Sequence, residues 1–260
     1  MSTHFPHGTF NWTDLVAKDI GEIRPFYEQL FGWTYEEQSA DHQGAPPYGV
    51  FFKDGKQAAG IGQMSDAMKD GGTPSTWNTY VAVDDIKATE TRVKQLGGSL
   101  MFDTIQVGDN GRTNWVRDPE GAVFALWEAG RHEGAGIFNE PGSFSWNERA
   151  TRNMDQVKGF YGELFNWRFK DDGNSPNPMA MIHRADGREQ GHVLLMNEQW
   201  GELPPHWSVY FTVARCTEAM DQAKALGGTS PFGPIDIDVG RFALLTDPQG
   251  AHFYVFEAKS

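Results

Sequence analysis

The sequence predicts an α+β protein of two tandem domains, each made of paired βαβββ units. The chain has 260 residues, enough for two domains of about 130 residues that each bury a core. A more specific observation is an internal repeat, in which the stretch 10–33 returns at 144–167 with a constant offset of 134 residues. The recurring aromatic residues are Phe10, Trp12, Phe26, Tyr27, Phe31 and Trp33, which return as Phe144, Trp146, Phe160, Tyr161, Phe165 and Trp167.

The first predicted unit opens with a strand over residues 9–17 and continues into a helix with an apolar face. Asp19 and Glu22 form a capping box at the start of this helix, and Gly32 ends it. Further strands are predicted where turn-rich stretches separate extended segments, at 33–38, 48–53 and 57–64.

The second predicted unit starts with an alternating strand over 77–83. Asp85 caps the following helix, Ile86 to Leu96, and Gly97 closes it. Three strands complete the unit, near 99–107, 112–117 and 122–128. The last two are joined by the turn AspProGluGly, in which Pro at the second position suits a type I turn.

A linker is predicted over residues 129–141, which are rich in Gly and polar residues and lack periodicity. The sequence therefore divides into a first domain, 1–128, and a second domain, 142–260. The second domain repeats the order of the first, with AspProGlnGly at 247–250 matching AspProGluGly at 118–121.

Composition narrows the range of partners and compartments. The formal charge of −13 without a basic stripe disfavours nucleic acid. No leader-like N-terminus and no window of about 20 apolar residues is visible, so we expect a soluble, cytoplasmic protein that does not bind membranes. The single cysteine, Cys216, cannot form an internal disulfide. The expected partner is a small molecule, and the oligomeric state stays open.

The arrangement resembles the vicinal oxygen chelate superfamily, which contains glyoxalase I, extradiol dioxygenases, fosfomycin resistance proteins and bleomycin-binding proteins. The resemblance covers nearly the whole chain and implies that the paired βαβββ units of each domain form an incomplete barrel around a cavity. It rests on the helix signature AspIle…PheTyr…LeuPheGlyTrp at 19–33, which recurs at 153–167, and on the AspProxGly turn before the last strand of each half. Because members of one fold differ in chemistry, the residues at the ligand positions must indicate the function.

In metal-dependent members, the resemblance implies His, Gln and Glu ligands on the first, fourth, fifth and eighth strands of each domain. At the first-, fifth- and last-strand positions this sequence has Trp12, Asn78 and Ala125 in the first half and Trp146, Ser208 and Tyr254 in the second. None is a good ligand for a divalent metal, which prefers imidazole, carboxylate or thiolate. The sequence therefore predicts no metal cofactor. The alternative is a divalent metal in the second half, near His192 and His252 with Glu148.

Strand alternation from Trp12 and Trp146 places an acid on the cavity side of each domain. These acids are Asp14 and Glu148, and we predict them as the catalytic residues because a carboxylate in an aromatic cavity needs a partner or serves as an acid or base. The predicted ligand-binding residues are Trp12, Asn78, Tyr80, Trp127, Trp146, Ser208, Tyr210, His252 and Tyr254.

Three functions remain open on these residues. The first is a lyase- or isomerase-like enzyme that transfers a proton on a small carbonyl or hydroxylated metabolite without the usual metal ligands. The second is a metal-independent protein that binds or sequesters an aromatic metabolite or antibiotic, since Trp and Tyr suit stacking. The third is an accessory protein whose cavities are vestigial.

Overall fold

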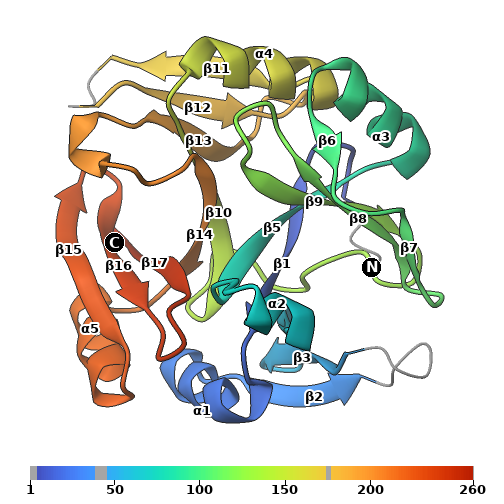
Figure 1. The fold of residues 1–260 in the computed structure, drawn as a ribbon. Coiled ribbons are helices and arrows are strands. Elements are labelled where there is room, and N and C mark those ends of the chain that lie inside the picture. The colour runs from blue at the N-terminus through green and yellow to red at the C-terminus, as the bar shows by residue number, and fades with distance from the viewer. Residues whose placement is uncertain (1–4, 39–45, 174–176, 260) are drawn as a thin grey trace. The chain divides into compact units, whose positions relative to one another are not determined.

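Strand pairing organises the computed structural model, which describes residues 5–38, 46–173 and 177–259, into two mixed sheets. The first sheet has the order β2-β3-β4-β1-β5-β9-β8-β6, with β7 paired to β8. Its strands are β1 (Phe10–Ala17), β2 (Thr34–Gln38), β3 (Tyr48–Lys53), β4 (Lys56–Gln63), β5 (Thr76–Ala82), β6 (Ser99–Leu100), β7 (Ile105–Val107), β8 (Gly111–Arg117) and β9 (Val123–Ala129). Figure 1 shows the strands in place.

The second sheet repeats this plan with the order β11-β12-β13-β10-β14-β17-β16-β15. Its strands are β10 (Ser143–Thr151), β11 (Arg168–Asp172), β12 (Met179–His183), β13 (Glu189–Leu195), β14 (His206–Thr212), β15 (Thr229–Ile237), β16 (Gly240–Thr246) and β17 (His252–Ala258). Each sheet takes its strands from one half of the chain, so the predicted α+β tandem repeat is confirmed. Among the described strands, neither sheet closes on itself.

The helices begin where the sequence predicts them, because the capping side chains bond as expected. Asp19 precedes α1 (Ile20–Phe31) and accepts from the backbone nitrogen of Glu22. Asp85 caps α3 (Ile86–Gln95) in the same way. Gly32 ends α1 with φ 66°, a left-handed conformation that glycine adopts readily. The remaining helices are α2 (Asp66–Asp70), α4 (Met154–Phe165), α5 (Cys216–Ala225) and the 3₁₀ turn η1 (Glu198–Trp200).

Two details differ from the predicted elements. The segment predicted as one strand over 99–107 is two short strands, β6 and β7, with residues 101–104 outside both. The short helix α2 lies between the predicted strands at 57–64 and 77–83, where no helix is predicted, and Ser65 caps it by accepting from the nitrogen of Met68. In the described part of the chain, no helix has both the length and the apolar content needed to cross a membrane.

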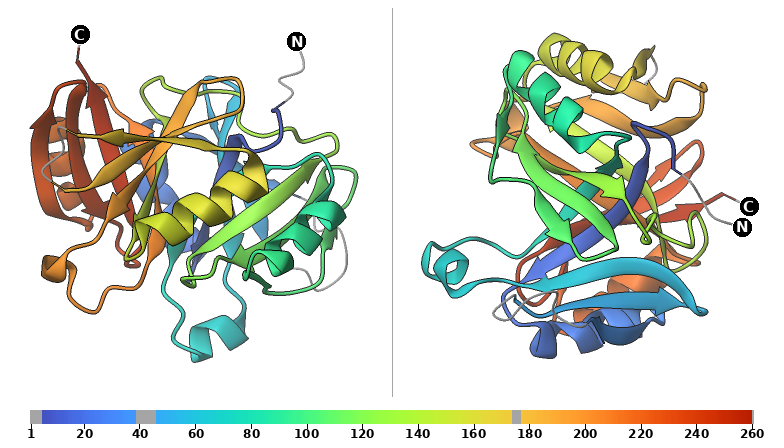
Figure 2. Two further views of the ribbon diagram at one scale, coloured as in Figure 1. Left: turned by 90° about the horizontal axis from the view of Figure 1, so that it is seen from above. Right: turned by 90° about the vertical axis from the view of Figure 1, so that its right-hand side faces the viewer.

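The chain packs into two compact units that each combine segments of both halves. Unit 1 contains residues 1–11, 79–134 and 146–208, and unit 2 contains residues 12–78, 135–145 and 209–260. Figures 1 and 2 show α3 beside α4 within unit 1, and α1 contacts α5 within unit 2. The domain limits read from the sequence, 1–128 and 142–260 with a linker at 129–141, stay a prediction.

A buried chain of three polar groups occurs in the core of each unit. In unit 2, Trp77 Nε1 donates to the hydroxyl of Tyr27 at 2.9 Å, and this hydroxyl donates to Oδ2 of Asp247 at 2.8 Å. In unit 1, Trp207, Tyr161 and Asp118 repeat the arrangement at 2.8 and 2.9 Å. The aspartates belong to the two AspProxGly turns, so each turn is hydrogen-bonded to the core of its unit.

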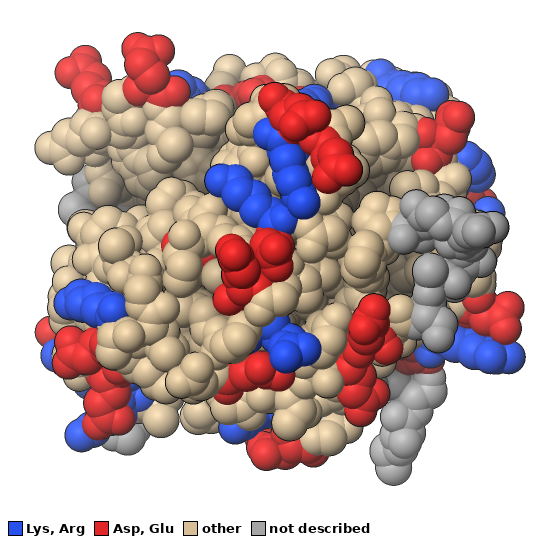
Figure 3. Space-filling view, turned by 60° about the horizontal axis from the view of Figure 1, so that its bottom comes forward, with Lys and Arg blue, Asp and Glu red and all other residues tan. Residues whose placement is uncertain are grey.

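The charge is distributed over the surface. On the face of the molecule shown in Figure 3, acidic and basic side chains are interspersed among uncharged ones. The described basic side chains form no continuous stripe on that face, although the chain carries a formal charge of −13.

Candidate functional site

The acid predicted in the second half, Glu148, contacts a histidine. Glu148 lies on β10 and pairs in register with His192 on the parallel strand β13. Side chains at paired positions share a face of the sheet, and His192 Nε2 lies 2.9 Å from Oε2 of Glu148. Only 4% of Glu148 is exposed, so this contact operates away from bulk water. A buried carboxylate beside an imidazole is an arrangement that can exchange a proton.

Trp146 fixes the role of each imidazole nitrogen. Its Nε1 lies 2.8 Å from Nδ1 of His192. An indole nitrogen can only donate, so Nδ1 of His192 must accept, and the ring proton is assigned to Nε2, which donates to Glu148. The resulting chain runs from Trp146 through His192 to Glu148 within unit 1.

The first half contains a corresponding row of three hydrogen-bonded side chains, with a different residue in the middle. In unit 2, Trp12 Nε1 donates to the hydroxyl of Tyr48 at 3.2 Å, and this hydroxyl makes a long hydrogen bond of 3.5 Å to Oδ2 of Asp14. Asn78 Nδ2 donates to Oδ1 of Asp14 at 2.8 Å. Burial raises the pKa of Tyr48 well above its ordinary value, and the charge of Asp14 adds to this effect. The phenol therefore stays protonated.

Gly60 leaves open the space beside Asp14 that the Tyr48 hydroxyl occupies. Asp14 pairs in register with Gly60 on β4, just as Glu148 pairs with His192 on β13. A Cβ atom at Gly60 would lie 2.0 Å from the Tyr48 hydroxyl, so any side chain there would displace the phenol. Tyr48, from the neighbouring strand β3, occupies the space over Gly60. Tyr48 is not among the site residues predicted from the sequence. A signal for it was the run AlaAlaGlyIleGly at 58–62, whose small residues admit a bulky neighbour.

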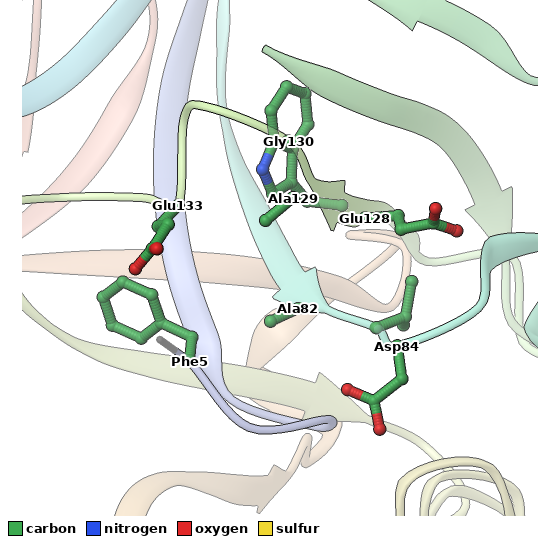
Figure 4. Close-up of a pocket in the computed structure, with 9 residues that line it drawn as sticks. Phe5, Ala82, Asp84, Glu128, Ala129, Gly130 and Glu133 are labelled. Atoms are coloured by element: carbon green, nitrogen blue, oxygen red, sulfur yellow. The ribbon is translucent and has the colours of Figure 1, made fainter. Parts of the chain in front are cut away.

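Two further predicted residues, Tyr80 and Trp127, lie together in unit 1. Their ring centroids are 6.5 Å apart, and Trp127 Nε1 donates to the carbonyl of His132 at 2.8 Å. Burial lowers the pKa of His132 to about 4, so this imidazole is neutral. Trp127 lines a cavity of about 360 Å³, part of whose lining is labelled in Figure 4. The other lining residues are Phe5, Ala82, Val83, Asp84, Glu128, Ala129, Gly130 and Glu133.

The remaining predicted ligand-binding residues lie on β14 and β17. Tyr210 and Tyr254 pair in register and stack with ring centroids 4.4 Å apart. Ser208, on β14, is partly exposed. His252 is exposed at the start of β17, and its Nδ1 lies 2.8 Å from Oγ1 of Thr246.

At the alternative metal site, both ring nitrogens of His192 face protein groups, Nδ1 facing Trp146 and Nε2 facing Glu148. Within residues 5–38, 46–173 and 177–259, no group of three His, Cys, Asp or Glu side chains is placed to hold an ion. No step of the chemistry below is therefore assigned to a metal.

Comparisons with known proteins agree on one family. The family described as Glyoxalase/Bleomycin resistance protein/Dioxygenase superfamily matches residues 9–126. "Putative glyoxylase CFP32" of Mycobacterium tuberculosis (strain CDC 1551 / Oshkosh) is 36% identical, over 98% of this chain and 97% of that protein. "Anthracycline biosynthesis protein DauV" of Streptomyces sp. (strain C5) is 34% identical, over 99% of this chain and 96% of that protein.

Solved structures share the fold at low sequence identity. The Mn(II)-bound glyoxalase from Novosphingobium aromaticivorans has a TM-score of 0.64 and 16% identity, covering 96% of this chain and 82% of that chain. The 2,3-dioxygenase LapB from Pseudomonas sp. KL28 has a TM-score of 0.62 and 16% identity, covering 98% of this chain and 94% of that chain.

Proposed function

We propose a proton-transfer function for this chain, which belongs to the glyoxalase/bleomycin resistance protein/dioxygenase superfamily. The substrate is a small carbonyl or hydroxylated metabolite, and the reaction is of the lyase or isomerase type. The observation that carries the proposal is the buried contact of 2.9 Å between His192 and Glu148, with Trp146 bonded to the other imidazole nitrogen. The relatives named as glyoxylases support a carbonyl substrate.

In this proposal Glu148 is the base. Its carboxylate takes a proton from the carbon next to a substrate carbonyl, which leaves an enolate, and the protonated carboxyl returns the proton to a substrate atom. His192 donates its Nε2 proton in a hydrogen bond to Glu148 and so orients the carboxylate. Trp146 is a positioning residue, because it acts through His192 and keeps Nδ1 an acceptor. Ser208, from the strand beside β10, is proposed to orient the substrate oxygen.

Exchange of substrate hydrogen with solvent deuterium tests the proposal without requiring a known product. The full-length protein, treated with a chelator, is incubated in heavy water with a panel of small hydroxyketones and ketoaldehydes, and deuterium uptake is followed by NMR. Glu148→Gln should lower the exchange rate at least about 100-fold, the contribution typical of a general base.

Asp14→Asn is the matched control, because it neutralises the corresponding acid of the first half. It should leave the exchange rate unchanged, and the melting temperature of both variants verifies that they are folded. Equal exchange by wild type and Glu148→Gln would remove Glu148 from the role of base.

The second candidate is a metal-independent protein that binds an aromatic metabolite or antibiotic. It is favoured by the first-half site, where a phenol replaces the imidazole and leaves Trp12, Asp14 and Asn78 as stacking and hydrogen-bonding groups. Relatives named as anthracycline biosynthesis proteins are consistent with an aromatic ligand. Binding of a ligand without deuterium exchange in any substrate would favour this candidate.

A further inference from the structure

A row of four side chains crosses unit 1 from the candidate site to the edge of the second sheet. Glu148 on β10 pairs in register with His192 on β13. His192 pairs with Met181 on β12, and Met181 pairs with Lys170 on the edge strand β11. Paired residues share one face of a sheet, so these side chains lie on one face. We use the name cross-strand row for Glu148, His192, Met181 and Lys170, of which the last two are not among the site residues predicted from the sequence.

The cross-strand row faces away from α4. Asp171, the neighbour of Lys170, is bonded to Lys158 of α4, which packs against β11 and β13 (Figure 1). Side chains alternate along a strand, so Lys170 lies on the opposite face from this helix. Ala180 is fully buried on the helix side, whereas Met181 is partly exposed and Lys170 is exposed. A ligand at Glu148 can therefore extend along the row to the edge strand.

The first half has the same row, but its middle is closed and its edge charge is reversed. Val50, the counterpart of Met181, is buried, and the hydroxyl of Tyr48 fills the space over Gly60. At the edge, Glu36 occupies the position of Lys170. The second half therefore differs from the first in an accessible row that ends in a cation. The first-half row consists of Asp14, Gly60, Val50 and Glu36.

The edge of the second sheet is basic around Lys170. Arg168 and Asp172, two residues away on either side, lie on the same face, and Arg168 is exposed like Lys170. Arg168 pairs with His183, and His183 Nε2 lies 3.1 Å from the carboxylate of Glu189 on the next strand. This imidazole contact engages the second acid of the face, so the two exposed cations outweigh the charge of Asp172. In a chain of formal charge −13, a local excess of cations favours an anionic ligand at this place.

We propose that the cross-strand row makes the Glu148 site selective for oxo acids. The substrate carbonyl lies at Glu148, an apolar segment lies over Met181, and the carboxylate forms an ion pair with Lys170. This inference rests on the proposed function, because it names the substrate class of the same site.

The spacing of the strands sets the length of the substrate. Neighbouring strands are about 4.8 Å apart, so Glu148 and Lys170 are separated by about 14 Å, of which the four-carbon stem of the lysine spans about 6 Å. The remaining distance of about 8 Å corresponds to about six bonds of an extended carbon chain between the reacting carbon and the carboxylate.

Binding of paired acids and amides tests the charge preference without requiring turnover. The affinities of 4-oxopentanoate, 5-oxohexanoate and 6-oxoheptanoate, and of the corresponding amides, are measured by isothermal titration calorimetry on the full-length protein. 6-Oxoheptanoate should bind most tightly, and about fivefold more tightly than its amide, with the difference declining at high salt because the lysine is exposed. Equal affinities for acid and amide, or no binding by any of the acids, would overturn the proposal.

Variants of Lys170 separate the lysine from the overall charge of the protein. Lys170→Glu introduces the first-half residue and should abolish the preference for the acid, while Lys170→Arg should retain it. Lys94→Glu is the matched control, because it changes the net charge by the same amount at an exposed position of α3 in the same unit. It should retain the preference. A preference that persists in Lys170→Glu, or that Lys94→Glu also abolishes, would contradict the proposal.

Deuterium exchange into 6-oxoheptanoate distinguishes this inference from the proposed function. In Lys170→Glu the KM for exchange should rise about tenfold with little change in kcat, since a contact remote from the reacting carbon binds substrate and transition state alike. Acid binding that depends on Lys170, without exchange in any acid, would support the cross-strand row and remove proton transfer as the function. Exchange that is equal for acid and amide, and unaffected by Lys170→Glu, would retain proton transfer and overturn the role of the row in selectivity.

Discussion

The two halves of the chain place the same kind of hydrogen-bonded chain at the same strand positions but give it different middle residues. In unit 2 the chain is Trp12, Tyr48 and Asp14, and in unit 1 it is Trp146, His192 and Glu148. Because burial raises the pKa of Tyr48, its phenol keeps its proton at neutral pH. An imidazole accepts on one nitrogen and donates on the other, so it can support proton transfer. The comparison favours binding at the first site and chemistry at the second.

The cores of the two units also differ in a buried arginine. In unit 1, Arg149 is fully buried and ion-paired with Asp118 at 2.6 Å and with Glu120 at 3.0 Å. The equivalent position in unit 2 is Leu15, and Gln249 replaces Glu120. Asp247, the counterpart of Asp118, is satisfied by Tyr27 and by the nitrogens of Gln249 and Ala251. A buried cation is therefore an addition to unit 1, and the Trp-Tyr-Asp chain forms without it.

The largest predicted effect comes from removing this cation. Arg149→Leu copies unit 2 but leaves Glu120 and Asp118 without their counter-ion, so the free energy of unfolding should fall by about 3 to 5 kcal/mol. Urea denaturation followed by tryptophan fluorescence measures the change.

The comparison between units supplies the control for Arg149→Leu. Adding Glu120→Gln completes the arrangement of Leu15 and Gln249, so the double variant should recover at least half of the lost stability. If the double variant is as unstable as Arg149→Leu alone, the residues found at these positions in unit 2 are not compatible with the core of unit 1.

The next effect sharpens the comparison of the two hydrogen-bonded chains. Trp146→Phe removes the donor to Nδ1 of His192, so the imidazole can adopt the other tautomer and lose its bond to Glu148. The deuterium exchange rate should fall about tenfold, equivalent to about 1.4 kcal/mol. Nitrogen NMR of His192 should show the Nε2–H tautomer in wild type and a mixture in the variant. Trp12→Phe should leave both measurements unchanged, and a tautomer unaffected by Trp146→Phe would contradict the positioning role.

Much of the fold could be predicted because its signals are local. The capping residues Asp19 and Asp85, the glycine at 32 and the two AspProxGly turns act within a few residues. The repeat supports the first cap, since Asn153 stands at the position of Asp19 and caps α4, but Arg215 at the position of Asp85 makes no side-chain cap. The break between β6 and β7 was missed, since alternation over 99–107 does not reveal which residues leave the ladder of backbone hydrogen bonds.

The candidate site could be predicted only in part. Alternation along one strand placed Asp14 and Glu148 beside Trp12 and Trp146. Alternation along one strand does not reveal Tyr48, because contacts between strands depend on their register. The hydroxyl of Tyr48 reaches Asp14 from β3 through the space that Gly60 leaves open. The alternative metal site considered from the sequence combines His192 and His252 with Glu148; in the structure the ring nitrogens of His192 face Trp146 and Glu148, and His252 contacts Thr246.

A smaller effect on the unfolding free energy is expected for Asp247, the unit 2 acid that has no buried cation beside it. Burial raises the pKa of Asp247, so the folded protein binds this proton more tightly than the unfolded chain does. The stability that Asp247 contributes is full below its ordinary pKa of 3.8 and is lost as the pH rises through the raised value. The difference in unfolding free energy between wild type and Asp247→Asn should therefore fall as the pH rises from about 3.5 to about 7. A difference that is flat with pH would contradict the shift.

The smallest expected effect is that of metal removal, and it bears on both halves. The positions at which the resemblance implies metal ligands are Trp12, Asn78 and Ala125 in one half and Trp146, Ser208 and Tyr254 in the other. Because these side chains are poor ligands, protein purified without added metal should contain less than one equivalent of any transition metal per chain. Chelation should then change neither the melting temperature nor the deuterium exchange. Elemental analysis with both measurements before and after chelation tests this. One equivalent that Glu148→Gln releases and Asp14→Asn retains would instead place a metal at Glu148 and His192, and it would give the contrast between the halves a different chemical basis.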